Sequence, residues 1–358
     1  MRIAIAVLLA AMACCMPLRA EVPIEEMVKV TLDGRTIEGS PLKWGRAEAR
    51  LLGRDGRLWR FSPAEVTGLH KTSDRFRSYS ASEFRASLMR DLGRGVEVTG
   101  TGHYLVAHPR GRQTTWPQRF EELHRSFVHY FAVRGLKPKE PPYPLVGIVC
   151  ADRGQFARYS EKKGTRLQPS TSGYYSLRSN RNILYDIDGR SGTGDWHTTA
   201  SVIIHEATHQ TAFNTGVHNR WTPPPLWVAE GLATMFEARG VHDSRHYPNR
   251  KDRVNHAQLR VFKRLIPRHK PALIRSLIAS DELFRANPRV GYAEAWALTF
   301  YLAETQPRKY MEYLAKTADY PPFANVTASQ RAADFTAIFG RDWKMLEARF
   351  LRFMAGVK

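Results

Sequence analysis

Apolar and polar positions alternate along the first part of the chain. Residues 28–39 (VKVTLDGRTIEG) and 49–63 (ARLLGRDGRLWRFSP) each contain two extended runs around an Asp-Gly pair, Asp33-Gly34 and Asp55-Gly56. Such a pair between alternating runs favours a hairpin, because both residues tolerate a positive φ angle. Residues 21–72 are therefore predicted to form a small all-β module.

A different pattern follows a predicted linker and helix at residues 73–95. Strands are predicted at 96–108 and 143–150, one amphipathic helix between them closing at Gly135, and a hairpin at 173–187 turning near Ser179-Asn180. After a Gly-rich loop the apolar spacing is helical to the C-terminus. Residues 96–358 are thus predicted to be an α+β domain with a sheet-bearing lobe (96–216) and a helical lobe (217–358).

Residues 1–20 have the pattern of a signal peptide. Arg2 precedes an apolar run, and Ala20 is a plausible cleavage point. We therefore expect an exported protein, periplasmic or secreted, with lipoprotein anchoring through Cys14 as the alternative. Cys150 would then be the one cysteine of the mature chain, in a predicted buried strand, so cysteine supplies no metal site.

The net charge of +20 is unevenly spread, and its densest stretch lies late in the chain. Residues 245–275 contain ten Lys or Arg side chains and a single acidic residue, Asp252. Behind a signal peptide, an anionic envelope polymer or lipid is a better partner for this segment than nucleic acid. A solvated basic face without a partner is the other interpretation. The sequence does not indicate an oligomeric state.

The stretch SVIIHEATHQTAFNTG (201–216) carries the candidate chemistry. It is predicted to be a helix capped by Asp195 or Thr198 and ended by Gly216. His205 and His209 are four residues apart, so both imidazoles project from one face and can share a metal ion. Glu206 lies beside them. This HExxH spacing serves a zinc site in which two imidazoles bind the metal and the glutamate takes a proton from water.

A third ligand is predicted in TPPPLWVAEGLATMFEARG (222–240). Glu230 falls on the apolar face of a predicted helix, and no Lys or Arg lies between Trp221 and Ala238 to pair with it. A metal ion would satisfy this buried carboxylate. Two histidines and one glutamate leave the fourth tetrahedral position of zinc open, which is the catalytic arrangement.

HEATHQ (205–210) followed by WVAEGLATMFE (227–237) resembles the gluzincin branch of the zinc metallopeptidases. GYAEAWALTFYLAE (291–304) is similar to a Tyr-x-x-Ala helix of the peptidase-MA-like group of exported bacterial proteins within that branch. The resemblance covers roughly residues 96–350. It implies a zincin-like fold, with His205, His209 and Glu230 binding one Zn²⁺ and Glu206 acting as general base.

The resemblance also implies a donor to the reacting carbonyl and an edge strand for the substrate. Tyr292 is the candidate donor, with His256 and Tyr301 as alternatives. The hairpin corresponds to the family's edge strand, which pairs with an extended peptide.

One position departs from the family pattern. Thr234 stands four residues after the third ligand, where some members have an acidic residue that orients a ligand histidine. Thr234 itself or Glu237 is expected to take that role for His205.

The sequence thus predicts an exported zinc-dependent endopeptidase acting on peptides or proteins. Two alternatives stay open. One is a catalytically weak or inactive zinc-fold protein that binds anionic envelope components, and the other is a metal-dependent hydrolase of a non-peptide amide. Glu206 favours catalysis, because a binding module does not need it.

Overall fold

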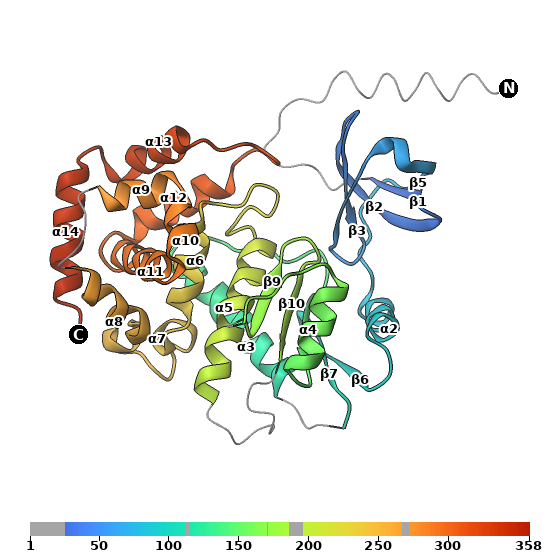
Figure 1. Ribbon diagram of the computed structural model, residues 1–358, viewed down its shortest axis with the longest axis horizontal. Helices are drawn as coiled ribbons and strands as arrows, with labels where there is room; N and C mark the ends of the chain where they lie inside the picture. The colour runs from blue at the N-terminus through green and yellow to red at the C-terminus, as the bar shows by residue number, and fades with distance from the viewer. Residues whose placement is uncertain (1–25, 112–114, 170, 186–195, 267–271) are drawn as a thin grey trace.

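The computed structural model of the chain describes residues 26–111, 115–169, 171–185, 196–266 and 272–358. The fold is α+β, with an antiparallel sheet, a mixed sheet and a helical region following one another along the chain (Figure 1). The antiparallel sheet lies at the opposite end of the molecule from the C-terminal helices. The predicted signal peptide (residues 1–20), with Cys14, lies outside the described residues.

The N-terminal sheet has the strand order β4-β3-β2-β1-β5. Its elements are β1 (Met27–Leu32), β2 (Arg35–Trp44), β3 (Ala49–Gly53), β4 (Leu58–Phe61), the 3₁₀ turn η1 (Pro63–Glu65) and β5 (Val66–Ser73). The β1–β2 turn holds Asp33 and Gly34 at φ angles of 48° and 71°, and Gly56 has φ 77° between β3 and β4. Both predicted hairpins are therefore present, and Val30 and Leu51 lie in the core beneath them.

The central sheet has the order β6-β7-β8-β10-β9. Its strands are β6 (Val96–Gly100), β7 (Tyr104–Pro109), β8 (Leu145–Cys150), β9 (Gly173–Ser176) and β10 (Arg181–Tyr185). β7, β8 and β10 are parallel, and the edge strands β6 and β9 are antiparallel to them. The β9–β10 hairpin turns at Asn180 (φ 58°), as predicted. Cys150 is buried, as expected, and burial raises the pKa of its thiol to about 12.

Four helices accompany the central sheet: α2 (Ala81–Leu92), α3 (Trp116–Ala132), α4 (Arg153–Lys162) and α5 (Trp196–Asn214). The sequence pattern predicted a single helix between the strands of this lobe, so α4 was missed. Its core-facing residues are few, Phe156 and Ser160, and this gives a weak helical period. Its clearest signal is Asp152, whose side chain accepts a hydrogen bond from the backbone of Gln155 and caps the helix.

The start of α5 differs from the prediction. The helix begins at Trp196, so Thr198 lies inside it and does not cap it, while Asp195 is outside the described residues. The end agrees, because the helix stops at Asn214 and Gly216 follows with φ 78°. The left-handed conformation at Gly216 is one that a residue without a Cβ adopts readily.

The rest of the described chain is helical. The elements are α6 (Leu226–Phe236), α7 (Arg239–His242), η2 (Arg250–Arg253), α8 (His256–Leu265), α9 (Leu273–Ala279), α10 (Glu282–Ala286), α11 (Pro288–Thr305), α12 (Pro307–Ala318), α13 (Ala328–Phe339) and α14 (Trp343–Ala355). α11 is buried along most of its length and packs against both α6 and α8. Among the described residues, no helix is sufficiently long and apolar to cross a membrane.

Gly231 fixes how α6 meets α11. A Cβ atom at this position would lie 2.6 Å from the Ala295 carbonyl oxygen and 2.2 Å from the Thr299 hydroxyl. The two helix backbones therefore approach as closely as glycine allows. This contact places Glu230, the residue before Gly231, against the first part of α11.

Candidate metal centre

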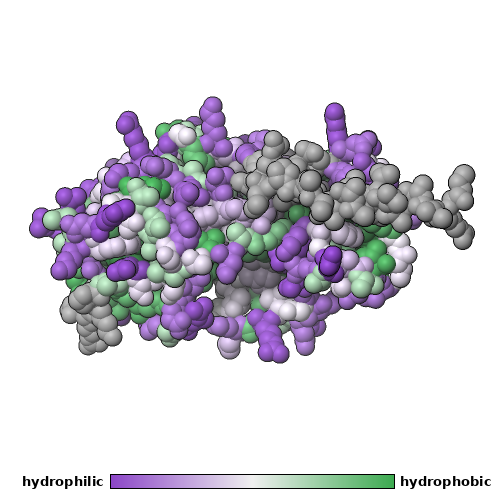
Figure 2. Space-filling view, turned by 90° about the horizontal axis from the view of Figure 1, so that it is seen from above, coloured by the Kyte–Doolittle hydropathy of each residue, from purple (hydrophilic) through white to green (hydrophobic). Residues whose placement is uncertain are grey.

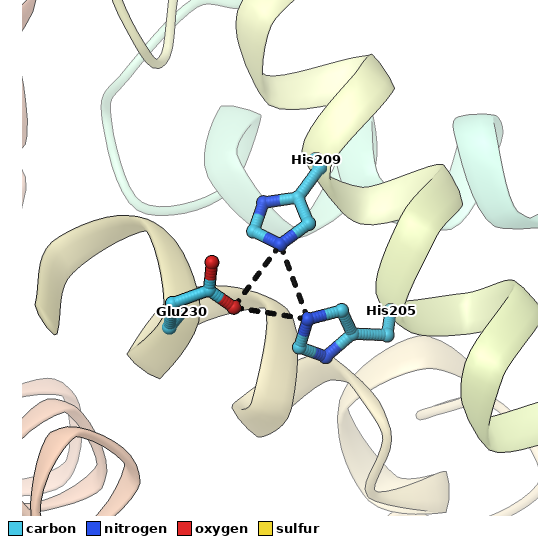
Figure 3. A group of neighbouring side chains, drawn as sticks. All are labelled: His205, His209 and Glu230. Atoms are coloured by element: carbon cyan, nitrogen blue, oxygen red, sulfur yellow. Dashed lines mark hydrogen bonds and ion pairs between the residues drawn. The ribbon is translucent and has the colours of Figure 1, made fainter. Parts of the chain in front are cut away.

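His205, His209 and Glu230 come together at the interface of α5 and α6 (Figure 3). The Nε2 atom of His205 lies 3.1 Å from Glu230 Oε2 and 3.1 Å from His209 Nε2. His209 Nε2 is 3.3 Å from the same Glu230 oxygen. Within the described chain this is the one group of three or more His, Cys, Asp or Glu side chains that could hold a metal ion.

The donor set of this cluster suits a cation. The Nδ1 atom of His205 is 2.9 Å from Glu237 Oε1. A carboxylate only accepts hydrogen bonds, so Nδ1 must carry the proton and a neutral His205 exposes a lone pair at Nε2. That lone pair faces a carboxylate oxygen and a second imidazole nitrogen. Three converging electron-pair donors need a proton or a metal ion between them, and imidazole with carboxylate is a ligand set that zinc accepts.

The protonation of the cluster reflects the same need. Burial lowers the pKa of His205, but its hydrogen bonds with Glu230 and Glu237 outweigh burial and raise that pKa well above its ordinary value. Burial raises the pKa of Glu230, yet the charge of His209 and the contacts with His205 lower it overall. The pocket therefore favours positive charge on the His205 imidazole and negative charge on the Glu230 carboxylate.

Glu237 is the residue that orients His205. Its second oxygen, Oε2, accepts a hydrogen bond of 2.9 Å from Asn255, which also donates to the Thr234 carbonyl oxygen at 3.0 Å. Among the described residues, nothing hydrogen-bonds the Thr234 hydroxyl. Of the two candidates considered from the sequence, the structure thus places Glu237 on the ligand histidine. Asn255 was not foreseen, because in the sequence it reads only as the cap of α8.

Glu206 points to the edge of the central sheet. Its Oε2 accepts a hydrogen bond of 2.6 Å from the backbone N–H of Tyr175 in β9. We call His205, His209 and Glu230 the ligand group. Successive residues on a helix point in different directions, so Glu206 is not a member of this group although it adjoins His205 in the sequence. The predicted general base thereby lies between the candidate metal ligands and the edge strand β9.

Tyr292 lies in the first part of α11, and its ring is 6.1 Å from that of His205, measured between centroids. Burial raises the pKa of its hydroxyl, and the neighbouring Glu230 and Glu206 carboxylates raise it further. A neutral hydroxyl beside the ligand group can donate a hydrogen bond. The alternatives fall elsewhere: His256 is exposed at the start of α8, and Tyr301 packs against Phe350 and Phe353.

Comparison with known proteins gives a family match whose residues span this cluster. Residues 199–324 match the model of a family described as a protein of unknown function, DUF1570. The matched segment contains Glu206, Tyr292 and all three members of the ligand group, and it omits the N-terminal sheet. A search of curated proteins found no match. The comparisons therefore place the cluster in a segment similar to this family. The chemistry of the cluster has to be inferred from its geometry.

Proposed function

We propose that this protein is a zinc-dependent endopeptidase with a zincin-like fold of gluzincin type. The observation that carries the proposal is the convergence of His205, His209 and Glu230 while Glu237 holds the Nδ1 proton of His205. A bound zinc ion would supply Lewis acidity toward a carbonyl group and would lower the pKa of water. Two imidazoles and one carboxylate leave a coordination position open for this purpose.

Glu206 and Tyr292 have complementary tasks in this proposal. Glu206 accepts the proton of the attacking water and later passes it to the leaving amine. Tyr292 keeps its proton and donates a hydrogen bond to the oxygen on which negative charge develops. Both side chains adjoin the ligand group. The Glu206 carboxylate is near enough to raise the pKa of the Tyr292 hydroxyl.

β9 supports a peptide as the substrate. It is an edge strand, and within the described residues it pairs on one side only, with β10. An extended peptide can add to such an edge through main-chain hydrogen bonds. The Tyr175 N–H that now binds Glu206 lies on this strand, so the edge and the general base are adjacent.

Two further expectations are part of the proposal. Export rests on the signal peptide pattern of residues 1–20, and an anionic envelope partner rests on the charge of residues 245–275. Arg268 and Lys270 of that segment lie outside the described residues. The non-catalytic alternative would use the same zinc fold without Glu206, whose place beside the ligand group favours catalysis.

The test combines metal content with cleavage of a mixed peptide library by the full chain. We expect about one zinc ion per chain and metal-dependent cleavage. Glu206→Gln should keep the metal and lower turnover by roughly 100- to 10,000-fold, because it removes only proton transfer. Glu312→Gln, an exposed change on α12, serves as the control. Equal turnover in the Glu206 variant and this control would refute the mechanism.

A further inference from the structure

A cavity adjoins the metal centre through Tyr292. It has a volume of about 400 Å³ and lies between α8 and α11. Its polar lining consists of Gln258, Arg260, Arg264, Arg289 and Tyr292. We call these five residues the basic pocket. Arg260 and Arg264 lie one turn apart on α8, so both guanidinium groups project from the same side of that helix.

Tyr292 connects the basic pocket to the metal centre. Its side chain lines the cavity, and its ring is 6.1 Å from the His205 ring between centroids. α11, which carries Tyr292, packs against α6 on the side of Glu230 and also against α8. A group bound in the cavity would therefore lie next to a substrate at the ligand group.

The three arginines of the basic pocket carry positive charge that no described acidic side chain balances. Within the described part of the chain, no acidic side chain pairs with Arg260, Arg264 or Arg289. Nearby, Arg250 and Arg253 behave differently, because both form ion pairs with Glu304. The basic segment is thus divided between cations neutralised within the fold and cations left facing a cavity.

We propose that the basic pocket binds a side-chain carboxylate of the substrate, so that the enzyme favours peptides with Asp or Glu near the bond that is cleaved. This inference rests on the proposed peptidase function. Guanidinium groups bind carboxylates through paired, charge-assisted hydrogen bonds, and Gln258 adds a neutral donor. The cavity of about 400 Å³ is large enough to admit an acidic side chain. Its position beside Tyr292 would make charge recognition a part of substrate selection at the metal centre.

The test uses acetylated and amidated peptides that differ only in one Asp or Asn near the cleaved bond. A third peptide has neutral side chains and a free C-terminal carboxylate. The pocket variant is Arg260→Gln/Arg264→Gln/Arg289→Gln. The control, Arg308→Gln/Arg341→Gln/Arg349→Gln, removes the same charge from exposed positions elsewhere in the helical region. kcat/KM is measured for each peptide, and calorimetry with proteins also carrying Glu206→Gln gives binding without cleavage.

We expect the Asp peptide to exceed the Asn peptide by roughly 10- to 100-fold in both measurements, since hydrogen bonds to charged groups are among the stronger ones. The pocket variant should abolish this preference, and the control should keep it. Equal losses in both variants, or a preference for the free C-terminus alone, would overturn the proposal. Asp-selective binding without any cleavage would instead overturn the peptidase function and leave the basic pocket standing.

Discussion

Glu121 on α3 and Glu230 on α6 are both largely buried carboxylates in contact with histidine, and their surroundings are opposite in kind. Glu121 is surrounded by hydrogen-bond donors. It accepts from the Thr101 hydroxyl at 2.8 Å, from the His103 backbone at 2.9 Å, from His103 Nδ1 at 2.8 Å and from Arg125 at 3.1 Å. Its charge is therefore satisfied by the protein alone.

Glu230 has imidazole nitrogens around it instead, and the Nδ1 proton of His205 is already used by Glu237. Its other neighbours are His209 and the Tyr292 hydroxyl, so without a metal a proton on His205 must balance its charge, and a bound metal ion would take the place of that proton. A buried Glu–His contact is thus not evidence of a metal site in itself. What distinguishes the two clusters is how many protons their neighbours can donate.

Exchanging the carboxylates for amides should separate the two clusters most strongly. Glu230→Gln removes a charged ligand and should abolish stoichiometric zinc, whereas Glu121→Gln should retain about one zinc per chain. Elemental analysis of the two purified variants measures the difference. Full zinc in the Glu230 variant, or loss in both, would show that the distinction between the clusters is wrong.

Tyr292 tests whether the ligand group is catalytic as well as metal-binding. Tyr292→Phe deletes only the hydroxyl, so kcat should fall by roughly 100- to 1,000-fold with little change in KM or zinc content. Steady-state kinetics on one library-derived peptide measures this. Tyr301→Phe is the control in the core. A Tyr292 variant within about threefold of the parent chain would make this tyrosine a packing residue.

Glu237 extends the comparison to a residue that hydrogen-bonds a candidate ligand, His205. Glu237→Gln keeps the size of the side chain but weakens its hold on the His205 Nδ1 proton, and zinc affinity should fall by roughly 10- to 100-fold. Competition with a chelator of known affinity gives the ratio of dissociation constants. Thr234→Val serves as the control, because its hydroxyl makes no hydrogen bond among the described residues. Equal affinities would exclude Glu237 from an orienting role.

The cluster of hydrogen-bond donors around Glu121 should affect stability and not metal binding. Glu121→Gln leaves donors around a weaker acceptor and should cost about 1–3 kcal/mol in the free energy of unfolding. Arg125→Gln, which alters an ion pair whose arginine is largely exposed, should cost less than about 1 kcal/mol. Urea unfolding of the metal-free proteins compares them. A larger loss from Arg125 would mean that the ion pair, and not the buried hydrogen bonds, stabilises the cluster.

Acid should weaken this cluster in two steps. Burial lowers the pKa of His124, which stacks on His103, from 6.5 to about 4. Burial raises the pKa of Glu121, but its hydrogen bonds with His103 outweigh this and lower that pKa from 4.5 to about 2. In each case the unfolded chain binds the proton more tightly, so stability falls from pH 6.5 toward 4 and again from 4.5 toward 2. Unfolding of His124→Phe should show a smaller first step than the parent chain, because buried His218, whose pKa is lowered to about 3, contributes to the same pH range. An unchanged profile would contradict the role of His124.

The sequence predicted contacts between residues at helical spacing or within one turn. It missed contacts between segments that share no sequence pattern. The i, i+4 spacing of His205 and His209 and the unpaired Glu230 in an apolar run identified the cluster, because helix geometry converts spacing into a shared face. The turns at Asp33-Gly34 and Asn180 were predicted from local backbone preference. Glu121 and His103 come from a helix and a loop with no pattern in common. The basic pocket likewise forms only where α8 packs against α11. The sequence showed that residues 245–275 are basic, but not which of their side chains line a cavity.

The close approach at Gly231 has a mechanical consequence. α6 cannot slide along α11 without meeting the Ala295 carbonyl, so Glu230, Tyr292 and the arginine of α11 move as a single body. Glu206 is carried by α5, and its hydrogen-bonded partner belongs to β9. Because His205 and His209 lie on α5 and Glu230 lies on α6, a metal ion held by all three would join these two bodies and keep the spacing between Glu206 and Tyr292 constant.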